Sequence, residues 1–135
     1  MRAPDYAEAL IGWRVWCVVA TADGLRLGSV IHEELWPRGT ELVARCDGGG
    51  RHEAPNEECS CGIHAAREPA TVWSYLRGRD EPGTVARVLG RVLLWGRVVE
   101  HEGGWRASHA YPLDFVATEP ELARSLASLQ ACASR

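Results

Sequence analysis

The sequence contains no lysine, and all 15 of its basic residues are arginine. A chain without lysine cannot form a Schiff base through a lysine amine, anchor pyridoxal phosphate or supply the lysine of a phosphate-binding loop. Long apolar runs are also missing, since no stretch approaches the roughly 18 to 20 residues that a membrane-spanning helix needs. Residues 1–6 lack the basic and apolar pattern of a signal peptide. We therefore expect a cytoplasmic protein with no membrane partner.

The composition is otherwise ordinary for a globular protein. The chain has 135 residues, of which 46% are hydrophobic and 24% charged, and we expect one domain over residues 1–135. A domain of this size can fold on its own core without disulfides. The net charge of −3 gives no general attraction to polyanions, so a nucleic-acid contact would need a local basic patch.

Runs of β-branched, aromatic and aliphatic residues predict five strands. They cover residues 12–20, 25–31, 40–46, 84–100 and 105–111. The Asp23-Gly24 pair predicts a first hairpin, and the Gly103-Gly104 pair predicts a second. Gly90 and Gly96 interrupt the longest run, and such glycines are typical of bulges or tight bends.

Two segments have the spacing of helices. In residues 68–77 apolar residues recur at helical intervals behind Pro69. Residues 118–132 place Leu122, Leu126 and Leu129 on one stripe, which predicts an amphipathic C-terminal helix. The predicted fold class is α+β: a small bent antiparallel sheet or partly open β-barrel with a metal-binding loop, a mid-chain helix and a C-terminal helix.

Cysteine and histidine gather in the segment 46–64. It holds five candidate metal ligands within 19 residues, namely Cys46, His52, Cys59, Cys61 and His64. The segment has a glycine triplet and no hydrophobic periodicity, so apolar packing alone does not explain how it would be ordered. Structural zinc sites use three cysteines and one histidine, among other sets, and they order loops that lack a core. We therefore predict a zinc-binding loop.

The three cysteines of this loop leave the fourth ligand open. Either His52 or His64 completes a four-coordinate set with Cys46, Cys59 and Cys61, or all five residues take part with one histidine as an outer-shell partner. A full shell of three thiolates and one imidazole leaves no open position for water. This favours a structural ion over a catalytic one.

The element His52-x-x-Pro55-x3-Cys59-x-Cys61-Gly62, together with residues 95–102 and 106–112, resembles a family of small uncharacterised bacterial proteins. The resemblance covers much of residues 46–113. In that family the position of His64 is often tyrosine, so the resemblance implies His52 as the ligand and His64 as the alternative. It implies no activity.

Two better-known patterns are only partly matched. Cys46-Asp47-Gly48 with His52 resembles the three-cysteine, one-histidine iron–sulfur domains, but here the Cys-x-Cys pair follows this element instead of preceding it. A [2Fe–2S] cluster is therefore the alternative cofactor. Zinc deaminases carry His-x-Glu and a later Pro-Cys-x-x-Cys, and this chain has neither spacing.

Three functions use the same cluster. We favour a non-catalytic binding or adaptor module with a protein partner. A zinc hydrolase would need an open coordination position and a base such as Glu53 or Glu57. A redox protein would use the Cys59/Cys61 pair or an iron–sulfur cluster. Cys17 and Cys132, which lie in a predicted strand and a predicted helix, are interpreted as packing thiols.

The tryptophans and arginines give weaker indications. Most of the six tryptophans, Trp73 on the helix among them, are expected in the core, with Trp36 and Trp105 as exposed exceptions. Arginines at even spacing on the late strands, joined by Arg106, would form a basic stripe if no bulge intervenes. Nucleic acid is thus a secondary partner prediction, through Arg87, Arg91 and Arg97.

Overall fold

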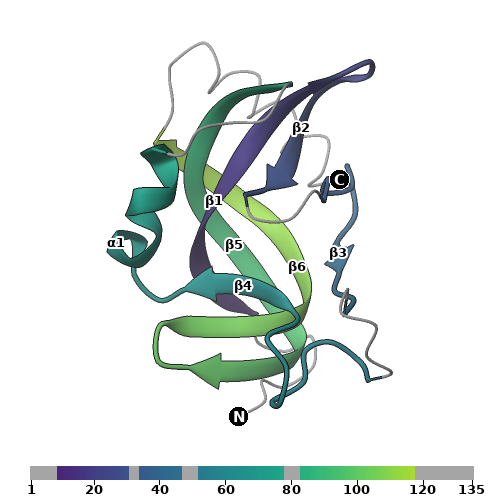
Figure 1. Ribbon diagram of the computed structural model, residues 1–135, viewed down its shortest axis with the longest axis vertical. Coiled ribbons are helices and arrows are strands. Elements are labelled where there is room, and N and C mark those ends of the chain that lie inside the picture. Colours follow the sequence, from purple (N-terminus) through teal and green to yellow (C-terminus); the bar gives the residue numbers. More distant parts are fainter. Residues whose placement is uncertain (1–8, 31–33, 47–51, 78–82, 118–135) are drawn as a thin grey trace.

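The computed structural model describes residues 9–30, 34–46, 52–77 and 83–117 (Figure 1). Its elements are six strands, one short α-helix and one 3-10 helix. In order they are β1 (Leu10–Thr21), β2 (Gly24–Ser29), β3 (Leu42–Val43), β4 (Ile63–Ala66), α1 (Pro69–Val72), η1 (Trp73–Arg77), β5 (Thr84–His101) and β6 (Gly104–Ala117). The helix predicted for residues 118–132 lies outside the described residues.

All strand pairs are antiparallel, as the sequence predicted. The central strand β1 pairs with β2, β4 and β5, and β6 pairs with β5, β4 and β3. These pairings connect β1, β5, β6 and β4 into a ring of strands. The long strands β5 and β6 are strongly curved within this ring (Figure 1). Strand β4 closes that ring through pairs such as Trp13 with Ala66 and Ala65 with Trp105. The sequence did not predict β4.

The bulges predicted at the β5 glycines are present. The register between β5 and β6 shifts between Leu89 and Gly90 and again between Trp95 and Val98. Gly96 has a φ of 81°, a conformation that favours glycine. The Arg97 backbone N–H next to this bulge donates to Ser108 Oγ at 2.9 Å.

The core is centred on Trp16, which is fully buried in β1. Its ring meets those of Trp36 and Phe115 edge to face, at centroid distances of 5.5 and 5.6 Å. The expectation that Trp36 is exposed is wrong, because its side chain is only 2% exposed and its indole N–H donates to Ser29 Oγ. The backbone N–H of Trp36 donates to the Leu27 carbonyl at 2.8 Å, which holds the segment after β2 back over the core.

The mid-chain helix is confirmed, although it is short. Helix α1 begins at Pro69, whose missing N–H costs nothing there, and continues as η1 beside β1 (Figure 1). Trp73, which the helical spacing placed in the core, is 51% exposed. Among the described residues no helix is long and apolar enough to cross a membrane.

Candidate metal centre

Three cysteines and one histidine of the predicted loop come together. The candidate ligand atoms of Cys46, His52, Cys59 and Cys61 all lie within 4.8 Å of one another. The Sγ atoms of Cys46 and Cys59 are 3.7 Å apart, and His52 Nε2 lies 3.3 Å from Cys61 Sγ. All four residues are partly buried. This cluster could hold a metal ion.

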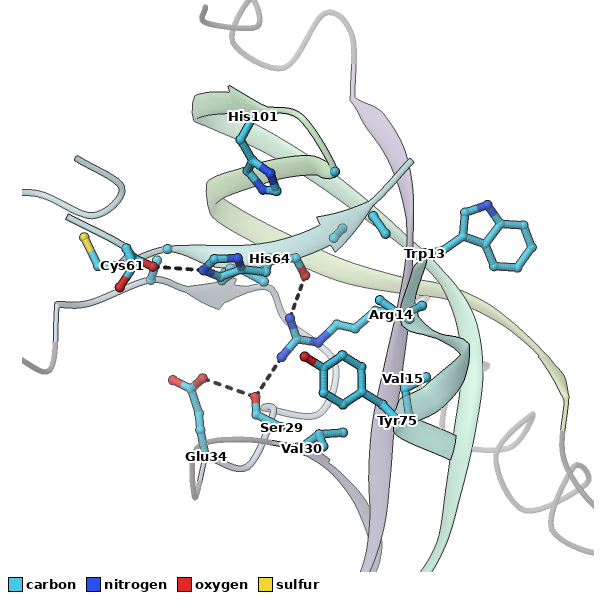
Figure 2. Close-up of a pocket in the computed structure, with 18 of the residues that line it drawn as sticks. Trp13, Arg14, Val15, Ser29, Val30, Glu34, Cys61, His64, Tyr75 and His101 are labelled. Atoms are coloured by element: carbon cyan, nitrogen blue, oxygen red, sulfur yellow. Dashed lines mark hydrogen bonds between the residues drawn. The ribbon is translucent and has the colours of Figure 1, made fainter. Parts of the chain in front are cut away.

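The other histidine of the segment is turned to a different partner. His64 Nε2 lies 2.9 Å from the carbonyl oxygen of Ser60, and its ring stands 6.1 Å from that of His101 (Figure 2). His64 is therefore not among the four residues whose ligand atoms meet. Its pKa is lowered, first by partial burial and then by the nearby charges of Arg14, Arg106 and His101.

Arg106 is the buried cation that organises the loop. Its side chain is only 8% exposed. The Nη1 nitrogen donates to the carbonyl oxygens of Asn56, at 3.1 Å, of Cys61, at 2.8 Å, and of Cys59. Arg106 lies on β6 opposite His64 of β4, so the sheet fixes the position of its guanidinium. One nitrogen of Arg106 thus holds together three backbone carbonyls of a segment that has no regular secondary structure.

The loop is also packed against itself. Pro55 is fully buried and follows a cis peptide bond from Ala54. Gly62 has a φ of 116°, and a Cβ there would come within 2.8 Å of Pro55 Cβ and 3.1 Å of Arg106 Cβ. The glycine that follows the Cys-x-Cys pair is therefore required both by its backbone conformation and by the lack of space.

A tight turn brings Cys59 to the cluster. The side chain of Asn56 accepts the N–H of Glu58 at 2.9 Å, and its carbonyl accepts the N–H of Cys59 at 3.1 Å. Asparagine is typical of such turns because its side chain replaces a backbone acceptor. The turn, the proline and the glycine together account for the spacing of the element between His52 and Gly62.

The thiols are not equivalent. A hydrogen bond from the Cys61 N–H, followed by hydrogen bonds from the Cys46 and Cys61 thiols, lowers the pKa of Cys59 from 9.0 to about 7. Burial raises the pKa of Cys61. Cys59 thus ionises more readily than Cys61, and a thiolate is the form that binds metal.

A cavity of about 520 Å³ adjoins the cluster. The loop that carries the cysteine cluster and β4 form one wall, β1 forms another, and α1 with η1 a third (Figure 2). The guanidinium of Arg14 from β1 lies inside, where Nη1 donates to the His64 carbonyl at 2.7 Å and Nη2 to Ser29 Oγ at 3.0 Å. It also stacks over the Trp36 ring at 5.0 Å. Burial lowers the pKa of Arg14 to about 10, while the charge of Glu34 acts in the opposite direction.

The remaining predicted residues lie apart from the cluster. The Glu53 side chain is 89% exposed, 3.9 Å from Arg97 Nη1, and Glu57 is also exposed. Cys17 is buried in β1, whereas Cys132 lies outside the described residues.

The three arginines predicted as a basic stripe have separate partners. Arg91 forms a two-pronged ion pair with Asp114, and Arg87 donates to the Tyr75 carbonyl at 2.6 Å. The bulges shift the β5 register against β6 along this stretch. A nucleic-acid contact through these residues stays a prediction.

Sequence reasoning missed Arg14, and it placed Arg106 only in the basic stripe and not beneath the loop. Arg14 interrupts an apolar strand pattern, and a lone cation in such a run was the available signal. Arg106 had no comparable signal, because its role depends on which strand lies beneath the loop.

Comparison with protein families, with curated proteins and with solved structures gives no match.

Proposed function

We propose that Cys46, His52, Cys59 and Cys61 bind one structural zinc ion, and that the chain is a non-catalytic binding or adaptor module. The observation that carries this proposal is the convergence of four ligand atoms within 4.8 Å in a segment without a hydrophobic core of its own. The set of three thiols and one imidazole is a common structural zinc set.

The distances inside the cluster support a single tetrahedral ion. Two sulfurs bound to one zinc at about 2.3 Å each lie about 3.8 Å apart when the coordination is tetrahedral. The Sγ atoms of Cys46 and Cys59 are 3.7 Å apart. In a [2Fe–2S] cluster the four ligands divide between two irons, which separates the two pairs. The compact cluster therefore favours one ion over the iron–sulfur alternative.

The charges are also balanced. A divalent ion with three thiolates and a neutral imidazole carries one net negative charge. The guanidinium of Arg106 brings one positive charge, and its hydrogen bonds to the Cys59 and Cys61 carbonyls hold it against the ligand-bearing backbone. A partly buried anionic centre next to a buried cation avoids an unpaired charge.

A hydrolytic zinc site fits the arrangement less well. Four side-chain ligands fill a tetrahedral shell, so no position is left for an activated water. The carboxylate of Glu53 is 89% exposed and faces Arg97 at 3.9 Å. Neither a vacant position nor a poised base supports hydrolysis.

The finer parts of the proposal are a protein partner, a cytoplasmic location and kinship with the small bacterial proteins described above. Among the described residues, Cys46, Cys59 and Cys61 are free thiols, and such thiols persist in a reducing compartment. Several apolar side chains on the described surface, including Val85 and Val116, are about half exposed. A protein partner would bury such side chains.

Metal analysis tests the central claim. Mass-spectrometric elemental analysis of protein purified without chelator and without air should give about one zinc per chain. If the analysis finds iron and sulfide instead of zinc, the site holds an iron–sulfur cluster and electron transfer becomes the proposed function. If it finds no metal, the metal site is refuted.

Variants then test the ligands. Cys59→Ser and Cys61→Ser should lose the ion and the hydrogen-exchange protection of residues 52–62, with the sheet retained. Cys17→Ala is the matched control, because that cysteine is buried in β1 away from the loop, and it should keep the metal. His52→Ala should lose zinc and His64→Ala should not; the reverse result would exchange the two histidines.

A further inference from the structure

The cavity beside the metal loop has the dimensions of a small-molecule site. Its volume of about 520 Å³ falls within the range of roughly 300–1,000 Å³ that is typical of ligand pockets. Much of its wall is apolar, from residues such as Val15, Ala65 and Val72, and a few polar groups converge on it (Figure 2). A mostly apolar cavity with a few converging polar groups is the usual form of a site that binds an organic ligand.

Arg14 supplies the strongest polar group of the cavity. Its guanidinium has five N–H donors, of which the His64 carbonyl and Ser29 Oγ each take one. Within the described part of the chain no carboxylate lies within ion-pair distance of it. Glu34 approaches only through Ser29, whose Oγ lies 3.5 Å from Glu34 Oε1. Arg14 therefore has both charge and donors left for a ligand.

The groups around Arg14 make the cavity attractive to an anion. His64 and His101 line the same space and carry donors, and Arg45 lies at the wall formed by the metal loop. Glu34 is the single described carboxylate among the lining residues. Arg106 balances the negative charge of the proposed metal centre. The charge of Arg14 is therefore not needed to neutralise that centre and can attract a ligand.

The same features select the kind of anion. One guanidinium matches one carboxylate, since two parallel N–H donors meet two oxygens. Arg45 at the wall is exposed, so Arg14 is the cation that meets the ligand, and a phosphate dianion would leave one charge uncompensated. Glu34 would repel a dianion more strongly than the single charge of a carboxylate. The apolar walls in turn require an apolar body.

We propose that this cavity binds a small organic acid, with its carboxylate on Arg14 and its apolar body against β4, α1 and the Tyr75 ring. The proposal rests on the proposed function in two respects: the metal-ordered loop forms one wall, and Arg106 balances the charge of the metal centre. It deepens that function by naming a ligand class for the binding module.

A titration of the full, zinc-loaded chain followed by amide NMR tests the proposal. The probes are 3-phenylpropionate and hexanoate, each compared with its neutral amide, which has the same shape without the charge. At least one acid should shift the signals of Arg14, His64 and Tyr75 saturably, and its amide should bind about tenfold more weakly or worse. Equal binding of acid and amide, or no saturable shift with either acid at millimolar concentration, would overturn the proposal.

Variants locate the contact. Arg14→Met should abolish the preference for the acid, while Arg38→Met, which changes an arginine outside the cavity lining, should retain it. Glu34→Gln should tighten binding of the acid because it removes the competing carboxylate. If Arg14→Met does not fold, Glu34→Gln and the comparison of acid with amide still decide the question. Unchanged acid binding in Arg14→Met, or weaker binding in Glu34→Gln, would contradict the proposed contact.

The two proposals fail in different ways. Full zinc content without binding of either acid would refute the cavity proposal alone. Binding of the acid by a protein that holds no zinc would refute the metal site and leave the cavity proposal standing.

Discussion

The ring of strands and the loop of residues 52–62 are ordered by different forces. In the ring, side chains such as Trp16, Val92 and Leu94 are fully buried and apolar. In the segment 52–62 only Ala54 and Pro55 are buried apolar residues. The other contacts are those of three thiols with an imidazole and of Arg106 with backbone carbonyls. Removing apolar area from water stabilises the ring wherever its residues pack, whereas the loop depends on a few directional contacts.

This difference predicts two levels of stability. The ring should unfold as one cooperative unit, and the loop should open locally at a lower free energy when its specific contacts are removed. The four predictions that follow test this separation, from the largest expected effect to the smallest.

Removing the centre of the core should unfold the whole protein most strongly. Trp16→Ala deletes a fully buried indole and should lower the free energy of unfolding by about 3–5 kcal/mol, measured by denaturant titration. Trp73→Ala is the control, because that ring is 51% exposed, and it should cost about 0.5 kcal/mol or less. Similar losses in the two variants would show that burial of Trp16 does not stabilise the ring.

Removing the buried cation should disorder the loop first. Arg106→Met deletes the donor shared by three carbonyls and should cost about 2–3 kcal/mol, since hydrogen bonds to charged groups are the strong ones. Hydrogen exchange should quicken in residues 52–62 before it does in β5, and metal affinity should fall. Arg38→Met, which removes an exposed bond to the Leu25 carbonyl, should change neither. Uniform acceleration over loop and ring would argue against two levels.

Adding one methyl group between Pro55 and Arg106 should weaken the loop more modestly. Gly62→Ala places a Cβ 2.8 Å from Pro55 Cβ at a φ of 116°, and we expect a cost of about 1–2 kcal/mol. Zinc competition with a chelator should show weaker binding than in the native chain. Native affinity in this variant would mean that the loop adapts at no cost.

Breaking the ion pair between the late strands should matter least. Asp114→Asn removes the partner of Arg91 and should cost at most about 1 kcal/mol, because both side chains are about a third exposed. Arg91 lowers the pKa of Asp114, so the stabilisation is complete above the ordinary pKa of the carboxyl and is lost as the pH falls through the lowered value. Native protein should lose this increment in acid, and the variant should not. Parallel pH profiles for the two proteins would contradict this account.

Local patterns in the sequence predicted much of the sheet but missed β4. Strands β1 and β5 could be predicted because their own residues form apolar, β-branched runs. The bulges could be predicted because glycines interrupt such a run. Strand β4 has only four residues, Ile63–Ala66, and exists because β1 and β6 hold it from both sides. Trp36 was misjudged for a similar reason, because a proline beside it indicates a turn but not what the turn folds back upon.

The sequence by itself determined the ligand types and the spacing of the candidate site. The sequence places three thiols, an imidazole, a turn-forming asparagine and a glycine at fixed intervals along one short segment. Residue types and their spacing are local properties that can be read without the fold. Only the tertiary structure decided that His52 and not His64 meets the three cysteines, that Arg106 lies beneath the loop and that Arg14 points into a cavity. These outcomes depend on which strands become neighbours, and strand pairing joins residues as far apart as Trp13 and Ala66, which no local pattern encodes.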